Sequence, residues 1–472
     1  MRKIKHKKYK WAKCLPLMLA CFFGYYSTAA AENVSPNGTS SNSIEINDEN
    51  YDVVYGGGDE ESSEDAIDNR IKVNGGELGG VLGGVSASGN VEGNEITIND
   101  GNIEGVTGGL SVVNSKLFNA SGNVSNNKVI IHGGTIQFVS GGEVAYTYSI
   151  NGNSDLTAEL LRLGNGNVFG NSVKVDGGTI GDIRGGAALS GDAFDNKIEI
   201  GGGTINGSII GGMSESGNAY GNTIDISGAP DIGNAVLIGG LSSSGNVFGN
   251  TLNIKGVSGL NVRSIEGFDK LGFELPTEGD TILNITGGAK TELTGTTIEV
   301  GSRGDNARVD TGLTLNLIRN SNGITGSNIQ LPNTLKKGVS FEYEIYLEDD
   351  AGNPIASRTA DDLASSADVD DGNFTATGFR ARVGNKIGGI KEETGNLVIE
   401  GDPPIPRTVV KTIDDNNNHW KPPEDEFREI QDQDEEISNE MKIFAGVNGS
   451  SLRTKLSDGG HINNKTIGFG LG

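Results

Sequence analysis

Short runs in which apolar and polar residues alternate recur along the first half of the chain. Typical runs are "NRIKVNGG", "NSVKVDGG" and "NKIEIGGG". Alternation with a period of two is typical of half-buried strands. The spacing between runs is 25, 33, 44, 25, 26 and 28 residues, which indicates a basic period of about 25 with insertions. Seven asparagines open these runs: Asn69, Asn94, Asn127, Asn171, Asn196, Asn222 and Asn250.

Each unit continues through a glycine corner into a second run, such as "TIGDIRGG", and then a loop of the form "SGNVxGN". The paired glycines are expected at corners where φ is positive. One unit cannot bury its own apolar face, whereas stacked units can. The repeat therefore predicts an all-β fold, a parallel β-helix with coils about 4.8 Å apart. We expect the asparagines to form an internal ladder whose amides bond to the coils above and below.

The composition fits this architecture, because 75 glycines and 6% aromatic residues in 472 residues suit a repetitive β protein better than one compact core. The pattern divides the chain into consecutive segments. They are a flexible or capping segment (32–65), β-helix repeats (66–280), irregular β structure (281–400), a Pro-rich acidic linker with a helix (401–440) and a strand pair (441–472). The helix is predicted from helical spacing of Phe427, Ile430, Ile437 and Met441.

The first 31 residues have the three-part layout of a secretory signal peptide: a basic start, an apolar stretch and small residues ending at Ala31. Lipidation of Cys21 is the alternative interpretation. Cleavage near Ala31 would also remove Cys14, so the mature chain would contain no disulfide. It would keep 30 basic residues against 62 acidic ones, a net charge of −32. Such a charge argues against nucleic acid as a partner.

The end of the chain contains two alternating runs, "KIFAGVNGSS" and "KTIGFGLG", joined by a turn-like segment. With the signal, the Gly/Asn-rich repeats and the linker, this order resembles a type V autotransporter of Gram-negative bacteria. The resemblance implies a β-helical passenger at the cell surface, a linker helix and a C-terminal outer-membrane β-barrel. Only about 30 residues are similar to the barrel itself, and the family's C-terminal aromatic residue is absent because the sequence ends in Leu471 and Gly472.

Two strands cannot close a membrane barrel. We therefore expect this chain not to secrete itself as written. The expected location is the outer membrane and cell surface if the reading frame continues, and otherwise the periplasm or medium. The resemblance implies host or bacterial surface molecules, protein or glycan, as partners. It also implies the outer-membrane insertion machinery as a partner if a complete barrel exists.

Some parallel β-helices are polysaccharide lyases or hydrolases, which need carboxylates clustered on neighbouring coils. The best candidates here are Asp182 with Arg184, followed by Asp192 and Asp195. We interpret the first two as a solvated surface pair, since no acidic cluster builds up on the other coils. The mature histidines are far apart in sequence, so neither a metal site nor any cofactor is predicted. These histidines are His132, His419 and His461.

The two long steps of the repeat contain insertions, Ser111–Ala120 and Ala145–Leu163. Tyr146 and Tyr148 in the second are candidates for partner contact, because exposed aromatic insertions often bind partners. The alternative is that both insertions fold over the rod as a cap or a small helix. The tripeptide Arg303, Gly304 and Asp305 is a further, weaker candidate for adhesion.

The sequence thus predicts an exported, non-catalytic passenger with an adhesive or structural role at the cell surface. Two alternatives stay open: a β-helical polysaccharide lyase or hydrolase, and a non-functional remnant of an autotransporter gene.

Overall fold

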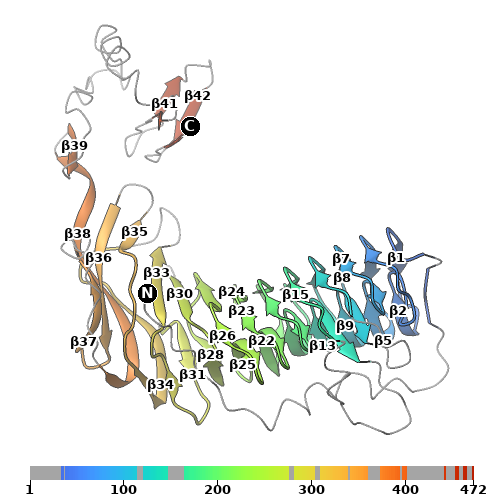
Figure 1. Cartoon of the computed structure of the whole chain (residues 1–472). Coiled ribbons are helices and arrows are strands. Elements are labelled where there is room, and N and C mark those ends of the chain that lie inside the picture. Colours follow the sequence, from blue (N-terminus) through green and yellow to red (C-terminus); the bar gives the residue numbers. More distant parts are fainter. Residues whose placement is uncertain are drawn as a thin grey trace.

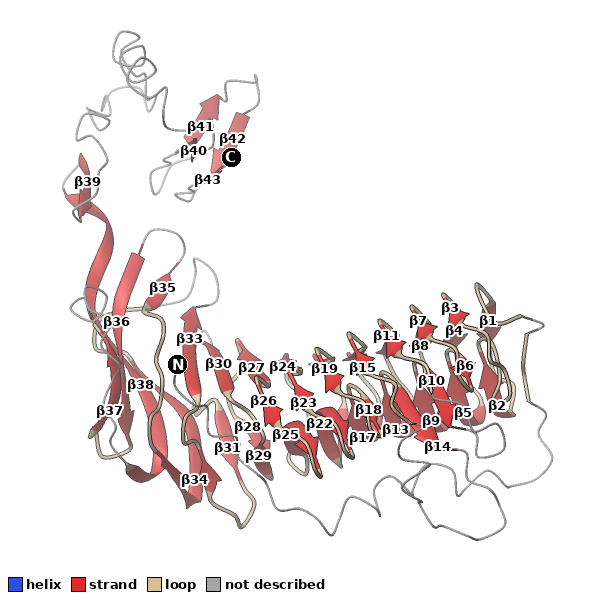
Figure 2. Ribbon diagram, in the orientation of Figure 1, coloured by secondary structure: helices blue, strands red, loops and turns tan. Residues whose placement is uncertain are grey.

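The computed structural model describes residues 33–36, 38–113, 121–146, 164–275, 281–302, 309–337, 341–359, 373–393 and 396–400, and four short strands between 441 and 471. In this part of the chain every regular element is a strand, and Figure 2 shows no helix there. No described segment is therefore a helix that could span a membrane. The predicted linker helix falls within 401–440, outside the described residues.

The fold is the predicted parallel β-helix. Figure 1 shows coils stacked in chain order along a rod. The runs that open with asparagine lie in sheet 1, which has ten parallel strands and continues beyond them through β30 (Lys270–Leu275) and β33 (Thr297–Ser302). Its strands, in spatial order, are β1 (Ser43–Ile46), β4 (Arg70–Val73), β8 (Glu95–Ile98), β12 (Lys128–Ile131), β16 (Ser172–Val175), β20 (Lys197–Ile200), β24 (Thr223–Ser227), β27 (Thr251–Lys255), β30 (Lys270–Leu275) and β33 (Thr297–Ser302).

The second run of each unit forms sheet 2, which bends at glycine pairs into two arms. The arms meet in β22. One arm contains β2 (Tyr51–Tyr55), β5 (Glu77–Leu82), β9 (Asn102–Thr107), β13 (Thr135–Ser140), β17 (Thr179–Arg184), β21 (Thr204–Ile205), β22 (Ser208–Ser214), β25 (Val236–Ser242) and β29 (Ser264–Glu266). The other arm contains β6 (Val85–Ser86), β10 (Leu110–Val113), β14 (Glu143–Tyr146) and β18 (Ala187–Ala188).

The "SGNVxGN" loops contribute two-residue strands that form sheet 3 and close each coil. All its strand pairs are parallel and join equivalent residues of consecutive coils. The strands are β3 (Ala66–Ile67), β7 (Val91–Glu92), β11 (Val124–Ser125), β15 (Val168–Phe169), β19 (Ala193–Phe194), β23 (Ala219–Tyr220) and β26 (Val247–Phe248).

The core is built from aliphatic side chains that repeat in register, because alternate residues of a strand point to the same side. One such column in sheet 1 is fully buried and continues through seven coils. It consists of Ile71, Ile96, Val129, Val173, Ile198, Ile224 and Leu252. Stacking therefore buries the apolar face that a single unit would leave exposed.

Sheet 4 ends the rod by changing from parallel to antiparallel pairing. Strands β31 (Leu283–Ile285) and β32 (Thr291–Glu292) pair in parallel with β34 (Thr314–Gly326), which then pairs antiparallel with β38 (Phe374–Glu393). Ile345, Leu347 and Phe379 from this sheet belong to the same apolar core as the coils. The strands are β28 (Leu260–Val262), β31 (Leu283–Ile285), β32 (Thr291–Glu292), β34 (Thr314–Gly326), β35 (Leu335–Lys337), β36 (Phe341–Asp349), β37 (Pro354–Arg358), β38 (Phe374–Glu393) and β39 (Asn396–Glu400).

In the C-terminal segment, one antiparallel pair joins the ends of the two predicted strand runs, and a second lies within the segment predicted to be a turn. β40 (Met441–Lys442) pairs with β43 (Gly470–Leu471), and β41 (Leu452–Lys455) pairs with β42 (His461–Asn464).

The rod begins one coil earlier than the predicted start at residue 66. Strand β1 pairs in parallel with β4, and β2 pairs in parallel with β5. Asn42 occupies the position equivalent to Asn69, and its backbone N–H and side-chain Nδ2 both donate to Asn69 Oδ1 at 3.0 and 2.8 Å. The sequence analysis missed this coil because no "SGNVxGN" loop precedes it.

The asparagines form one buried ladder, and all seven named from the sequence are fully shielded from solvent. In a typical rung, Asn94 Oδ1 accepts hydrogen bonds from the backbone N–H and Nδ2 of Asn69, at 3.0 and 2.8 Å. Asn94 Nδ2 donates to Asn127 Oδ1 and to the Ala66 carbonyl, at 2.8 and 2.9 Å. Both amide hydrogens and both oxygen lone pairs are thus satisfied, which makes this burial of a polar group favourable.

The glycine pairs serve two different purposes. Where sheet 1 ends, the expectation of positive φ is correct, as at Gly178 with φ of 87°. At the bend of sheet 2 it is wrong: Gly186 is not among the positive-φ residues. A Cβ there would lie 2.7 Å from Asn196 Nδ2, so glycine is needed because the backbone packs directly against the ladder.

The residue before each ladder asparagine adopts the left-handed conformation, and it is Gly, Asp or Asn in every coil from Asp68 to Gly249. We expect Gly249→Ala to destabilise the rod by about 1–2 kcal/mol, the cost of a Cβ in this conformation. A clash would not contribute, because the nearest atom to a Cβ there is 3.6 Å away. Chemical denaturation measures the change.

Gly288→Ala is the matched control for that substitution, since a Cβ at Gly288 meets nothing within 4 Å and its φ is not positive. It should be neutral or slightly stabilising. Equal losses in both variants would contradict the assignment of strain at Gly249.

Candidate interaction surfaces

The acidic residues that could have formed a catalytic site are not gathered at one place. Asp182 lies in β17 of sheet 2, whereas Asp192 and Asp195 flank β19 of sheet 3. Asp182 Oδ1 accepts the Ser208 N–H at 2.6 Å, and Asp192 Oδ1 accepts the Asn218 N–H at 2.7 Å. Both carboxylates therefore join one coil to the next.

Arg184 is not the solvated surface residue that the sequence suggested. It is 6% exposed, and its Nη1 lies 3.6 Å from Oε1 of Glu143, which is 4% exposed. Its guanidinium also stacks over the Phe138 ring, 4.8 Å from the ring centroid. The expectation was wrong because the strand bends at Gly185 and Gly186, and the coil before it supplies an acid and an aromatic ring beside the arginine.

Burial raises the pKa of the Glu143 carboxyl, while the Arg184 charge and a hydrogen bond with Ser140 oppose that rise. The pair is therefore a buried ion pair whose carboxylate depends on one cation for compensation. The sequence carried little signal for it, since Glu143 and Arg184 are separated by an insertion and meet only through coil stacking.

This pair lies in what we call the outer seam, the outward side of the bend in sheet 2. Seam side chains alternate along the strands with core residues, so they point away from the core. Side chains of both arms meet across the bend in two apolar clusters, one on each side of the ion pair. The first contains Val53, Leu82, Val85, Leu110, Val112 and Ala145, and the second contains Ala187, Ile210 and Met213.

A second surface, which we call the aromatic ridge, follows the outward side of sheet 3. It consists of Phe169, Phe194, Tyr220 and Phe248, one ring from each of four consecutive coils. Neighbouring ring centroids are 4.9, 5.0 and 4.8 Å apart, and the planes differ by 1–6°. Phe248 is 38% exposed, and among the described residues no other large hydrophobic side chain is classed as exposed. The ridge is thus a regular row of stacked, partly exposed rings.

A second, outer ladder runs beside the ridge, two residues before each ring. Its members are Asn167, Asp192, Asn218 and Asn246, and it continues toward the N-terminus through Asn123 and Asn90. In each step a side-chain Oδ1 accepts the backbone N–H of the next member, at 2.7–3.1 Å. The four members beside the ridge are half-buried, so solvent reaches their polar groups.

Tyr220 lies between acidic groups. Burial raises the pKa of its hydroxyl, and the nearby carboxylates of Asp192 and Asp195 raise it further. The Asp195 carboxylate is exposed and forms no ion pair or hydrogen bond with any residue in the described ranges. Aromatic surface and hydrogen-bonding groups therefore occur together at the middle of the ridge.

The partner-contact candidates named from the sequence lie at the limits of the described residues. Tyr146 is the last residue of β14, where it pairs with Val113. Tyr148 and the tripeptide Arg303, Gly304 and Asp305 lie outside the described residues.

Metal-binding side chains do not gather within the described ranges, where no group of three or more His, Cys, Asp or Glu could hold an ion. His132 Nδ1 lies 3.4 Å from Asp176 Oδ2, and the same oxygen also accepts a hydrogen bond from Lys174 Nζ at 2.7 Å.

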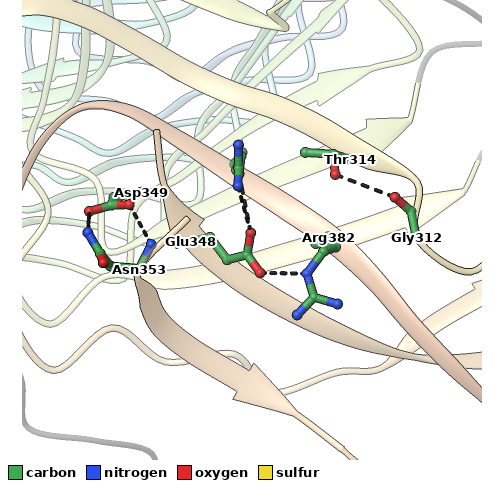
Figure 3. A network of polar contacts seen from close by, with 7 residues as sticks. Gly312, Thr314, Glu348, Asp349, Asn353 and Arg382 are labelled. Atoms are coloured by element: carbon green, nitrogen blue, oxygen red, sulfur yellow. Dashed lines mark hydrogen bonds and ion pairs between the residues drawn. The ribbon is translucent and has the colours of Figure 1, made fainter. Parts of the chain in front are cut away.

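Sheet 4 contains an ion-pair network between its strands β36 and β38 (Figure 3). Glu348, 6% exposed, lies between Arg380 and Arg382, at 3.1 and 2.5 Å. The Arg382 guanidinium also lies 4.4 Å from the centroid of the Tyr346 ring. Because Glu348 lies in β36 and both arginines lie in β38, we interpret this network as joining the two strands.

Comparison with known proteins found no match: no family model, no curated protein and no solved structure resembles this chain significantly.

Proposed function

We propose that this chain is an exported, autotransporter-like passenger that acts at the cell surface as a non-catalytic rod, with an adhesive or structural role. The observation that carries the proposal is the construction of the rod. Its described coils are joined by backbone hydrogen bonds, the buried asparagine ladder and stacked aliphatic side chains. Both cysteines lie within the first 31 residues, so the rod needs no disulfide.

A chain of this kind can cross a membrane unfolded and fold afterwards coil by coil, since each coil contacts chiefly its neighbours. Its long lateral faces offer regular surface for contact with a partner. The basic and apolar N-terminal segment acts as the signal peptide that directs the chain to export. The candidate carboxylates are dispersed, and those of Asp182 and Asp192 accept coil-to-coil hydrogen bonds, which favours a binding or structural role over hydrolysis.

Export is tested by expressing the full chain in a Gram-negative host. We expect a product that is shortened by about 31 residues and located outside the cytoplasm. Replacing Leu17 and Leu19 by Arg should leave a full-length product in the cytoplasm, because charges abolish the apolar stretch. The matched control replaces both by Ile. Full-length cytoplasmic product from the unmodified chain would refute the proposal.

A further inference from the structure

We propose that the aromatic ridge, with the outer ladder beside it, is a binding surface for an uncharged linear polysaccharide that lies along the rod axis. The inference rests on the proposed function, because it names the partner of a surface-exposed rod. It depends on the shape of the ridge, the kind of polar group beside it, and the charge of the chain.

The shape of the ridge suits a ligand with weakly polar C–H groups. Carbon atoms in contact are about 3.5–4.0 Å apart, so parallel rings that touch with centroids 4.8–5.0 Å apart are offset sideways by about 3 Å. Offset stacking leaves part of each ring face outside the stack. Sugar rings bind aromatic side chains through C–H groups that contact such faces.

The polar groups beside the rings suit hydroxyls. A hydroxyl both donates and accepts hydrogen bonds. Three of the four outer-ladder members beside the ridge are asparagines, whose amides also do both, and the fourth is Asp192, which accepts. Within the described residues, Nδ2 of Asn167 and of Asn246 donates to no protein acceptor. Asp195 adds an exposed acceptor near the Tyr220 hydroxyl.

Charge separates this ligand from the other candidates. A mature net charge of −32 repels acidic polysaccharides. A basic protein segment would match a row of carboxylates, but three of the four outer-ladder positions are neutral amides. With acidic polysaccharides and basic protein segments excluded, an uncharged polymer is the remaining candidate. Because the aromatic ring and its polar neighbour recur on four successive coils, a polymer built of repeating units fits this surface.

The test uses the purified, folded full chain and soluble probes in a calorimetric titration. The neutral probes are linear glucose oligosaccharides with α-1,4, β-1,4 and β-1,3 linkages, and the charged probes are polygalacturonate and poly-L-lysine. We expect at least one neutral probe to bind with little dependence on salt. Phe194→Leu should weaken that binding about tenfold, since it removes one ring while keeping an apolar side chain.

Tyr220→Phe keeps the stack and should weaken binding less, so it remains informative if Phe194→Leu fails to fold. Lys174→Ala, on the outward side of sheet 1, is the control and should bind like the unmodified chain. Three outcomes would overturn the inference: no neutral probe binds, both ridge variants bind normally, or only poly-L-lysine binds and salt abolishes it. Export is tested separately in cells, so its failure is distinguishable from failure of this surface.

Discussion

Asn196→Asp is expected to destabilise the rod by about 3–5 kcal/mol at neutral pH, the cost of an uncompensated buried charge. The substitution preserves shape but replaces the Nδ2 group, which donates to Asn222 Oδ1 and the Val168 carbonyl at 3.1 and 3.0 Å. The introduced carboxylate would face two acceptors. Because burial raises its folded pKa, the loss should be smallest near pH 4 and should grow as pH rises. Denaturant midpoints at several pH values measure it.

Asn246→Asp is the matched control, because Asn246 belongs to the outer ladder and its Nδ2 has no protein acceptor among the described residues. The outer ladder already contains a natural acid at Asp192. We expect a change within about 0.5 kcal/mol. A similar loss at both positions would mean that the buried ladder is not the special feature of the fold.

Arg184→Met is the second substitution with a large expected effect, a loss of about 3–5 kcal/mol at neutral pH. Methionine fills similar space but leaves Glu143 buried without its compensating cation. The pKa of Glu143 is already raised by burial, so the folded state binds its proton more readily than the unfolded state does. Stability from this group is therefore present below the ordinary glutamate pKa and declines as pH rises through the raised value.

The double variant Glu143→Gln with Arg184→Met separates charge from packing. It should recover most of the loss at neutral pH and should show a weaker pH dependence than Arg184→Met alone. If the double variant were as unstable as the single one at every pH, the loss would come from the packing of Arg184 on Phe138.

Much of the fold could be predicted because its signals are local and periodic. The alternation in "NKIEI" predicts the strand β20 without reference to the rest of the chain, and the regular spacing of the asparagines predicts stacked coils. The ladder followed from the same spacing, since a buried amide that recurs once per coil can hydrogen-bond to its equivalents. Asn42 was not predicted as a ladder residue because no "SGNVxGN" loop precedes it. The residue before it, Ser41, adopts the left-handed conformation, but it is not Gly, Asp or Asn as in the later coils.

The surfaces were harder to predict because they depend on which side chains meet across coils. Glu143 and Arg184 meet because the chain, after the 44-residue step between Asn127 and Asn171, stacks its next coil in register on the preceding one. No local sequence pattern indicates the residue at which the register is restored. The aromatic residues of the ridge recur at equivalent positions of the repeat, as in "GNVFG" and "GDAFD". A two-residue strand, however, has too few positions for its alternation to show that the rings of Phe169 and Phe194 point outward.

The most direct test of the account measures the distance between two coils that are far apart in sequence. Glu95 and Thr251 occupy the same column of sheet 1, five coil steps apart. Cysteines introduced at both positions would be the only thiols outside the first 31 residues. Spin labels attached to them should give a narrow distance distribution near 24 Å. A broad distribution, or one centred far from this value, would contradict the stacking of one repeat per coil on which both proposals rest.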